Sequence, residues 1–594
     1  MCAIWNISTP LIYTCFSLRG KMARILDQRM YSRANICVVS YWASSLWTRV
    51  VCDAMFKSKD VNVSEYFSTP NPGLTSYFDR VRAGQPDEYR TPFYKGKSVT
   101  KVVQDWMTRL SPLRQKWPTL YEFEKDLASK VGPLSIQQPL ERRMDDIANY
   151  YDLISLDQTD IAQSAIAAVL REFGQVRGLS PRPQDAVVRR MKLSTNSGSP
   201  YFTKRRGVLS KTVPLDAHCA HALNSHDSES IVTQHLPFKT WKSCAILGWR
   251  GQEGGPTDVD VKQRVVWMFP FGVNVCELQV YQPLIEKCQQ YNLVPAWVSM
   301  EAVDREITAL FDTKGRQDVI LCTDFSKFDQ HFGPSCQKAA RTILGGLLNR
   351  DRESSRWLLG VFPIKYHIPM MYDYGKMSVG PHGMGSGSGG TNADETLVHR
   401  ALQYEAAILN NSQLNPHSQC LGDDGILSYP GITVDDVMRA YTSHGLEMNA
   451  SKQYTSTQDC TYLRRWHHQD YRVEGICVGV YATTRALGRL CEQERYYDPE
   501  IWGPHMVALR QLSIIENVKW HPLRDEFVDY CMKGDKYRLG IDIPGFLDNI
   551  DSYAKESIEY MPDFLGYTKS LGYNPTKDGG ISNWWVVQYL KSKV

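Results

Sequence analysis

The spacing of apolar residues predicts helices early in the chain. Apolar positions recur three and four residues apart in KVVQDWMTRL (101–110) and DIAQSAIAAVLREF (160–173), which places them on one face of a helix. We expect residues 101–190 to be mostly helical. Residues 191–275 are irregular, punctuated by glycine and locally basic. Short strands and helices are expected to alternate from 300 to 490, and the chain then becomes helical again.

Two short apolar segments predict strands. DVILCTDF (318–325) is rich in β-branched residues and is typical of a buried strand that ends at Asp324. CLGDDGILSY (420–429) places Asp423 and Asp424 between glycines and apolar residues, which predicts a tight β-hairpin with both aspartates at its tip. Adjacent carboxylates repel one another, so the tip is either an ordinary surface turn or a cation site.

Length and composition exclude several classes of protein. A chain of 594 residues favours a large multi-lobed enzyme or several domains. Hydrophobic residues make up 43% of the chain, which disfavours disorder. A net charge of +4 is low for a protein that wraps nucleic acid over its whole surface, although it allows a basic channel. The 15 cysteines form no C-x-x-C pair, so we expect reduced thiols, with neither a zinc site nor a disulfide framework.

Two uncharged segments near the N-terminus raise the question of a membrane. Residues 3–18 and 34–47 carry no charge, but each is too short to span a bilayer comfortably. No basic region precedes the first segment, so a signal peptide is a poor fit. We interpret both as core or interface helices and expect no clear membrane anchor, with a membrane tether as the alternative.

Aspartates at strand ends are the candidates for metal-assisted phosphoryl transfer. Such chemistry uses two cations about 4 Å apart that carboxylates bridge. Mg²⁺ takes few protein carboxylates and keeps water and phosphate oxygens as its other ligands. Asp423 and Asp424 would supply one side, and TDFSKFDQ (323–330) would supply Asp324, with Asp329 near a bound sugar. Taken alone, each segment is equally well explained as a solvated turn or helix start.

A glycine-rich segment lies between these aspartates. GMGSGSGGTNADET (383–396) opens into a predicted helix, and so small a set of side chains allows the backbone to approach a phosphate or a sugar. Alone, this segment would be read as a flexible linker. The order of strand aspartate, glycine loop, helix and Asp-Asp hairpin is more informative than any one of these parts.

These segments resemble the palm of viral RNA-directed RNA polymerases. TDFSKFDQHF is similar to motif A, GSGSGGTNADE to motif B and LGDDG to motif C, in wording close to the polymerases of picobirnaviruses and more distantly to those of partitiviruses. Four further segments resemble the remaining motifs of the family: TNSGSPYFTKRR resembles motif G, VKQRVVWMFP motif F, GLEMNASKQY motif D and TYLRRWHH motif E. All follow in the order G, F, A, B, C, D, E, from about residue 195 to 468.

The resemblance implies RNA synthesis from ribonucleoside triphosphates with release of pyrophosphate. Asp324 and Asp423 would bridge two Mg²⁺ ions, with Asp424 close behind and Mn²⁺ as an alternative metal. Lys452 lies where motif D places a lysine proposed to protonate the departing pyrophosphate, and a structural lysine is the alternative.

The resemblance also implies residues that bind the incoming nucleotide: Lys262, Arg264, Asp329, Ser386, Thr391 and Asn392. Lys262 and Arg264 alternate along a predicted strand and therefore share one face, which could equally be a charged edge. Many relatives place an asparagine four residues after the motif B threonine, where this chain has Glu395. We favour Asn392 as the residue that reads the ribose. Glu395 would then orient Asp329 through water or lie on a solvated helix face.

Contacts to template and primer are expected from motifs G and E. The residues implied are Ser197, Gly198, Pro200, Lys204, Arg464 and Arg465. Such contacts to the RNA backbone are independent of sequence and sensitive to salt. The expected partners are template and nascent RNA, ribonucleoside triphosphates and a viral capsid. The expected location is the host cytoplasm, in a virion or a replication complex of a double-stranded RNA virus.

The predicted fold is an α+β right hand with fingers, palm and thumb, an antiparallel palm sheet and closure by contacts between fingers and thumb. The palm would resemble a ferredoxin-like unit. The predicted domains are an N-terminal extension (1–110), fingers (111–310), a palm (311–467) with an inserted finger segment at about 340–382, and a thumb with the C-terminal tail (468–594).

Two rival functions remain from the sequence. A reverse transcriptase shares the palm, but such enzymes usually carry Met or Ala before the paired aspartates and a bulky residue at the sugar gate. Gly422 and Asp329 stand at these positions and favour RNA synthesis. The second rival is a non-catalytic RNA-binding protein that keeps the fold, against which the intact Asp324, Asp423 and Asp424 argue.

Overall fold

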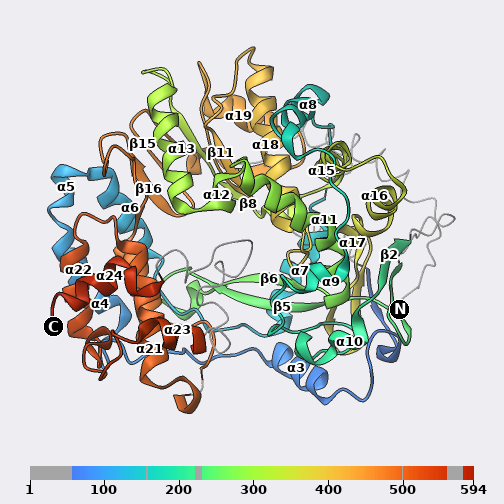
Figure 1. Ribbon diagram of the computed structural model, residues 1–594, viewed down its shortest axis with the longest axis horizontal. Coiled ribbons are helices and arrows are strands. Elements are labelled where there is room, and N and C mark those ends of the chain that lie inside the picture. Colours follow the sequence, from blue (N-terminus) through green and yellow to red (C-terminus); the bar gives the residue numbers. More distant parts are fainter. Residues whose placement is uncertain (1–56, 155–157, 221–230, 498, 558–579) are drawn as a thin grey trace, which may run out of the picture. The chain divides into compact units, whose positions relative to one another are not determined.

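A four-stranded antiparallel sheet carries the predicted catalytic segments. The computed structural model describes residues 57–154, 158–220, 231–497, 499–557 and 580–594 (Figure 1), so the uncharged N-terminal segments lie outside the described residues. The strand order is β11-β12-β7-β14. Its strands are β7 (Ile320–Thr323), β11 (Gln419–Leu421), β12 (Asp424–Leu427) and β14 (Tyr454–Ser456). The predicted buried strand before Asp324 and the predicted hairpin are therefore both present.

Helices cover this sheet because their apolar faces need a partner. Val303, Ile307 and Leu310 of α13 (Met300–Thr313) share a core with Ile320 of β7 and Ile426 of β12. Helix α18 (Thr391–Leu409) runs from the glycine-rich segment and is buried along most of its length. Its neighbours include α8 (Gln163–Glu172), α15 (Pro334–Leu347) and α19 (Val434–Thr442). A helix buried on all sides needs hydrogen-bond partners for most of its polar side chains.

A second sheet carries the predicted basic strand. Its order is β1-β10-β9-β5-β6, and only the β5–β9 pair is parallel. The strands are β1 (Lys57–Asp60), β5 (Ala245–Gln252), β6 (Lys262–Met268), β9 (Met370–Asp373) and β10 (Lys376–Val379). Strand β6 is the edge strand, and helix α11 (Phe271–Gln290) follows it directly. Lys262 and Arg264 lie two residues apart on β6, as their alternation predicted.

Three smaller sheets complete the strands of the described residues. One consists of β2 (Asp216–Ala220), β3 (Ile231–His235) and β4 (Thr240–Lys242). Another pairs β8 (Phe325–Ser326) with β13 (Glu447–Met448), directly after Asp324. The third contains β15 (Asp459–Tyr462), β16 (Arg465–His468) and β17 (Val480–Tyr481), so the predicted motif E segment forms a hairpin. No helix in the described ranges is long and apolar enough to cross a bilayer.

The helices at the C-terminal end share one core with helices from residues 99–129. The blue α4 (Val99–Met107) and α6 (Pro118–Ser129) lie beside the red C-terminal helices in Figure 1. These are α20 (Thr483–Cys491), α21 (Pro499–Ile515), α22 (Arg524–Gly534), α23 (Ile550–Ser557) and α24 (Trp585–Lys591). The predicted boundary at residue 110 between N-terminal extension and fingers falls between α4 and α6, and both helices share their core with the C-terminal helices. Order along the chain does not decide which core a helix joins.

A buried carboxylate fixes α6 to the start of α20. The Glu124 carboxylate accepts hydrogen bonds from the backbone N–H groups of Thr483 (2.7 Å) and Thr484 (3.0 Å). These are free donors at a helix N-terminus, where a negative charge is also favourable. Burial alone would raise the pKa of Glu124, but His521 at 3.0 Å and the bonds from Thr483 and Thr484 lower it overall. Glu124 therefore remains an anion that joins α6 to the N-terminus of α20.

We expect the last helix to be a structural part of this core. Leu590 of α24 is fully buried among the thumb helices. The Leu590→Ala change should lower the free energy of unfolding by about 2–5 kcal/mol, because it leaves a cavity. Chemical denaturation measures this loss, and Gln588→Ala, on the exposed face of the same helix, is the matched control. Equal stability of the two variants would contradict the packing of α24.

A buried ion pair between Glu405 and His444 ties α18 to the end of α19. His444 is only 1% exposed, and its Nδ1 donates to the Thr159 carbonyl at 2.7 Å. Burial lowers the pKa of His444, but the bonds to Glu405 and Thr159 outweigh it and raise the pKa overall. A raised pKa in the folded state means that the protonated histidine stabilises the fold below about pH 6.5, the unfolded value.

We therefore expect His444→Gln to destabilise the protein in a pH-dependent way. At pH 6 the loss should be about 1–3 kcal/mol, as for a buried charged hydrogen bond. The loss should shrink as the pH rises through the folded-state pKa, because the wild-type histidine then gives up its proton. Unfolding curves at pH 6 and pH 9 measure this, with the exposed Thr442→Ala as control. A loss of the same size at both values would contradict the role of the charge.

Candidate active site

The tip of the β11–β12 hairpin is a two-residue loop. Leu421 pairs with Asp424, which leaves Gly422 and Asp423 in the turn. Gly422 has a φ of 60°, and glycine at the first loop position is typical of the tight turns that suit a twisted hairpin. The turn therefore projects Asp423 from the tip and starts the next strand with Asp424.

Two side chains of α18 form hydrogen bonds with the backbone of this turn. The backbone N–H of Gly422 donates to Thr396 Oγ1 at 2.9 Å, and its carbonyl accepts from His399 Nδ1 at 2.8 Å. Burial lowers the pKa of His399 to about 4, so the ring is neutral and carries its proton on Nδ1. A Cβ at Gly425 would lie 2.5 Å from the His399 ring, so the hairpin packs directly on the helix. Sequence reasoning missed both residues, although two polar residues three apart in a buried helix were a signal.

Strand β7 brings Asp324 next to this hairpin. Thr323 pairs with Gly425 in antiparallel strands, so Asp324, one residue later, lies opposite Asp424, one residue earlier. Neighbouring strands of a sheet are about 4.8 Å apart. Burial raises the pKa of Asp424 to about 7, and repulsion from Asp423 and Asp324 adds to the rise. Gln453 holds the backbone of Asp324, donating to its carbonyl at 2.7 Å and accepting from its N–H at 3.0 Å. The backbone therefore places Asp324 beside Asp424, next to the turn that carries Asp423.

The aspartates and the side chains around them, called the recess below, are partly withdrawn from water. Asp423 is exposed at the hairpin tip, yet loss of hydration raises its pKa, as does the charge of Asp329. Burial also raises the pKa of Asp324, which Lys452 partly offsets. Among the described residues, no group of three or more His, Cys, Asp or Glu side chains is arranged so that it could hold a metal ion. The arrangement is a cluster of like charges that a cation would relieve.

Two predicted nucleotide-binding residues meet at the side of this recess. Arg264 of β6 forms an ion pair with Asp329, which lies on α14 (Phe328–His331). Asp329 is buried, whereas Arg264 is partly exposed. The charge of Asp329 raises the pKa of Arg264 further above its usual value. Lys262 is exposed two residues earlier on the same strand, so β6 presents both cations beside the aspartates.

The family model described as viral RNA-dependent RNA polymerase matches residues 90–476. This chain belongs to that family. It is 60% identical over 534 residues to a potential RNA-dependent RNA polymerase of a human picobirnavirus (strain Human/Thailand/Hy005102/-), covering 89% of this chain and 98% of the relative. The resemblance to picobirnavirus polymerases is therefore confirmed.

Two crystal structures are similar to this polymerase. One is the RNA-dependent RNA polymerase of a human picobirnavirus, with 59% identity and a TM-score of 0.84. The other is an insertion-loop deletion mutant of such an enzyme, with 57% identity and a TM-score of 0.83. Each match covers 90% of this chain and 100% of the other. The polymerase fold is therefore confirmed.

The motif B residues of the polymerase lie in the glycine-rich loop and at the start of α18. Ser386 Oγ accepts from the backbone N–H of Trp267 at 3.3 Å, and Thr391 Oγ1 donates to the Gly385 carbonyl at 3.1 Å. Asn392 is exposed, and its Oδ1 accepts from Trp297 Nε1 at 2.7 Å. Its Nδ2 lies 3.5 Å from the position of a Cβ at Gly422. Asn392 therefore faces the catalytic hairpin, while Ser386 and Thr391 bond within the loop and to β6.

Two buried residues of α11 clamp the motif B loop. Glu277 accepts hydrogen bonds from the Ser388 hydroxyl and from the Gly389 N–H at 2.8 Å. Asn274 Nδ2 donates to the Gly387 carbonyl at 3.1 Å. No spacing pattern indicated either residue, because their partners lie more than 100 residues further along the chain. The clamp sets how closely the glycine loop approaches β6.

The motif G turn packs against the junction of β6 and α11. The Ser197 carbonyl accepts from the Phe271 N–H at 2.8 Å, and a Cβ at Gly198 would lie 2.8 Å from the Phe269 carbonyl. Pro200 is buried in the same turn, and Lys204 is exposed beyond it. The structure therefore places this turn beside the fingers sheet, with Lys204 open to solvent.

The motif E hairpin separates its two arginines. Arg464 in the turn forms an ion pair with Glu253 at 3.2 Å. The positive charge of Arg464 offsets part of the rise in the pKa of Asp423 and Asp424 that loss of hydration causes. Arg465 points elsewhere, toward the Gly479 carbonyl (3.3 Å) and the Asn517 side chain (3.4 Å). Of the two, Arg464 lies near the aspartates, and Arg465 is engaged by the protein itself. Lys452, in motif D, is exposed, and its charge offsets part of the rise in the pKa of Asp324 that burial causes.

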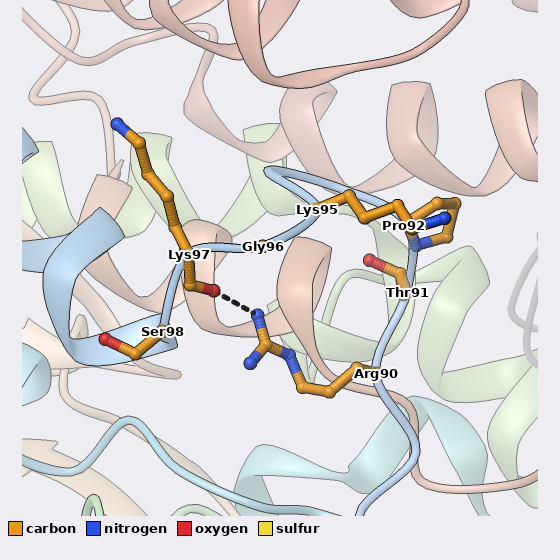
Figure 2. Close-up of a pocket in the computed structure, with 7 residues that line it drawn as sticks. All are labelled: Arg90, Thr91, Pro92, Lys95, Gly96, Lys97 and Ser98. Atoms are coloured by element: carbon orange, nitrogen blue, oxygen red, sulfur yellow. Dashed lines mark hydrogen bonds between the residues drawn. The ribbon is translucent and has the colours of Figure 1, made fainter.

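A cavity of about 620 Å³ lies apart from these motifs. Figure 2 shows the residues that line it: Arg90, Thr91, Pro92, Lys95, Gly96, Lys97 and Ser98. Arg90 Nη2 donates to the Lys97 carbonyl at 3.2 Å, the bond that is dashed in Figure 2. The lining contains none of the predicted site residues, so this cavity is separate from the recess of the aspartates.

We expect the spacing between the motif B loop and β6 to be essential. A Cβ at Gly387 would lie 1.6 Å from the Trp267 carbonyl, so Gly387→Ala must push the loop away from β6. RNA synthesis should fall at least about 100-fold, since small misplacements in an active site cost this much. Gly174→Ala, where the added Cβ meets nothing within 4 Å, is the control. Wild-type activity in the Gly387 variant would show that the loop tolerates displacement.

Proposed function

We propose that this polymerase copies an RNA template by two-metal nucleotidyl transfer from ribonucleoside triphosphates and releases pyrophosphate. One observation carries the proposal: Asp324 and the hairpin aspartates Asp423 and Asp424 converge from neighbouring strands, in a recess that raises the pKa of each. Like charges so close together are unfavourable unless a cation balances them. The transcription and replication of a viral RNA genome follow from this activity.

The residues of the recess fit two Mg²⁺ ions, with Mn²⁺ as an alternative. Asp324 and Asp423 would bridge the ions, and Asp424 would lie close behind. A few carboxylates suffice, because Mg²⁺ keeps waters and substrate phosphates among its ligands. When bound, the ions would lower the pKa of the attacking 3′-hydroxyl and balance the charge of the triphosphate.

The cations around the recess have separate tasks in this proposal. Lys262 and Arg264 bind the triphosphate from β6, and Lys452 protonates the departing pyrophosphate. Arg264 is held by Asp329, so a triphosphate must compete with that carboxylate for the guanidinium. The exchange frees Asp329 to accept a ribose hydroxyl, next to Ser386, Thr391 and Asn392.

Template and primer would lie along the motif G turn and the motif E hairpin. Ser197, Gly198 and Pro200 shape the turn that steers the template, and Lys204 supplies charge there. Arg464 contacts the primer backbone, whereas Arg465 contributes by fixing the hairpin to the thumb. Contacts of this kind read no bases, as copying of any sequence requires.

Charged contacts support a hand that is closed between fingers and thumb. Glu253, after β5, forms ion pairs with Arg485 (3.1 Å) and Arg489 (3.2 Å) of α20. Arg250 of β5 pairs with Glu494 at 3.3 Å, just beyond α20. The surrounding arginines lower the pKa of Glu253 to about 2 despite its burial, so it stays ionised. These pairs link the sheet of motif F to the C-terminal helices.

The remaining partners follow from the function. Template, nascent RNA and nucleotides bind in the recess, and a viral capsid is a further proposed partner. The proposed location is the host cytoplasm, in a virion or a replication complex. A reverse transcriptase and a non-catalytic RNA-binding protein are the rivals, and both are tested by which nucleotides the protein incorporates.

We expect Asp423→Asn to abolish RNA synthesis without unfolding the protein. Loss of a bridging carboxylate should lower the rate at least about 1,000-fold, because several kcal/mol of charge stabilisation are lost. The melting temperature should stay equal or rise, since one of several repelling charges is removed. A primer-extension assay on an RNA template with Mg²⁺ measures the rate.

The control for this experiment is Asp435→Asn, an exposed aspartate in the first turn of α19. It should retain wild-type synthesis. Parallel reactions with deoxyribonucleotides distinguish the polymerase from a reverse transcriptase. Undiminished synthesis by the Asp423 variant would exclude the two-metal proposal, and incorporation of deoxyribonucleotides in preference would favour the first rival.

A further inference from the structure

Asn274 is a buried amide that contacts two of the predicted motifs. It lies in the first turn of α11 and is only 5% exposed. Its Oδ1 accepts a hydrogen bond from Nη2 of Arg205, in motif G, at 2.9 Å. Its Nδ2 donates to the carbonyl of Gly387, in the motif B loop, at 3.1 Å. One side chain that belongs to no motif therefore joins two segments far apart in the sequence.

Both segments pack on the junction of β6 and α11. The Ser197 carbonyl of the motif G turn accepts from the Phe271 N–H at 2.8 Å. In the motif B loop, a Cβ at Gly387 would lie 1.6 Å from the Trp267 carbonyl, so the loop touches the end of β6. Contacts this close leave little freedom in how far each segment stands from the junction. Asn274 follows Phe271 by one helical turn and bonds to both segments.

The partners of Asn274 require an acceptor and a donor in one side chain. A guanidinium can only donate hydrogen bonds, so Arg205 needs an acceptor. A carbonyl oxygen can only accept them, so Gly387 needs a donor. The same Nδ2 also donates to Glu277 Oε2 at 3.1 Å, one turn further along α11. These partners fix the orientation of the amide, and neither a carboxylate nor an aliphatic side chain could make all three bonds.

Arg205 is a partly buried cation with no acid beside it. Its Nε donates to the Asn196 carbonyl at 3.2 Å, and its guanidinium lies over the Phe271 ring, 5.3 Å from the centroid. Burial lowers the pKa of Arg205 to about 10, so it is still charged at neutral pH. Among the described residues, no carboxylate pairs with Arg205, whereas Arg264 and Arg464 each have one. A phosphate of the template would therefore reach this guanidinium without displacing an acid.

We propose that Asn274 is a positioning residue that holds the motif G turn and the motif B loop in a fixed register. Through its amide, Arg205 determines where the Gly387 carbonyl lies, and with it how far the glycine loop projects toward a bound nucleotide. Contact with the template at motif G and nucleotide binding at motif B then depend on one bond network. This inference rests on the proposed function and names the residue that couples two of its binding sites.

Substitutions can separate the two halves of this network. Asn274→Asp keeps an acceptor for Arg205 but turns a carboxylate oxygen, in place of the amide nitrogen, toward Gly387. Asn274→Leu keeps much of the volume and makes none of the bonds. Arg205→Met keeps much of the aliphatic stem but has neither the charge nor a donor. Gln290→Ala, at the exposed end of α11, is the control and should behave as the wild type.

Two quantities are measured for each variant. Fluorescence anisotropy with a labelled RNA gives the template Kd, and incorporation of one ribonucleotide at saturating primed template gives kcat/KM. We expect Asn274→Asp to bind the template within about threefold of the wild type but to lose about 10- to 100-fold in kcat/KM, the effect of a lost buried hydrogen bond to a loop that must be positioned. Arg205→Met should weaken template binding, reduce its salt dependence and lower kcat/KM as well.

The decisive comparison is a double-mutant cycle on kcat/KM. If Arg205 acts on the loop through Asn274, the Arg205→Met change lowers kcat/KM in the wild type but has little further effect in the Asn274→Leu background. Two side chains that only stabilise the fold independently would instead give losses that add. Thermal unfolding shows whether each variant is folded, and Asn274→Ala replaces the leucine variant if that one is not.

Two results would overturn the inference. One is additive losses in the double variant, and the other is wild-type kcat/KM in Asn274→Asp. Either result leaves RNA synthesis by the wild type in place, so only the role of Asn274 fails. Absence of ribonucleotide incorporation by the wild-type chain would instead remove the proposed function itself.

Discussion

Repulsion among neighbouring acids is the constraint on which the rest of this structure depends. The recess gathers acidic side chains from three segments: Asp324, Asp329, Asp423, Asp424 and Glu395. Loss of hydration raises the pKa of Asp324, Asp423, Asp424 and Glu395, so the protein holds these groups where isolated side chains would separate. Only a scaffold with little freedom can do this. The surrounding elements are therefore held by buried polar contacts as well as by apolar packing.

Helix α18 is the main part of that scaffold. Thr396 and His399 bond the backbone of the catalytic turn. One turn earlier, Asp394 forms a buried ion pair with Lys365 at 3.1 Å and accepts bonds from two tyrosines, Tyr281 and Tyr366. A buried pair like this gives little net stability, but loss of either partner is costly. It therefore fixes the position of the helix, and with it the hairpin and Glu395.

Local patterns were enough to predict the strands and the hairpin, because the period of apolar residues and the Gly-Asp turn are properties of a few neighbouring residues. The resemblance of the motifs extended this to the polymerase fold. The contacts of Glu277 could not be predicted, since they depend on a segment far away in sequence. The same holds for the adjacent Arg464 and Arg465, which a tight turn sends in different directions, and for α6, which joins the thumb core.

Several arginines near the site are paired with carboxylates of the chain itself. Arg264 is paired with Asp329, and Glu253 gathers Arg464, Arg485 and Arg489. A nucleic-acid or triphosphate ligand must therefore displace a carboxylate to reach such a guanidinium, which reduces the gain from each contact. Weak, replaceable contacts suit an enzyme that must move along its template after each addition. At the aspartates the neighbouring charges are alike, and there cations rather than RNA are expected to bind.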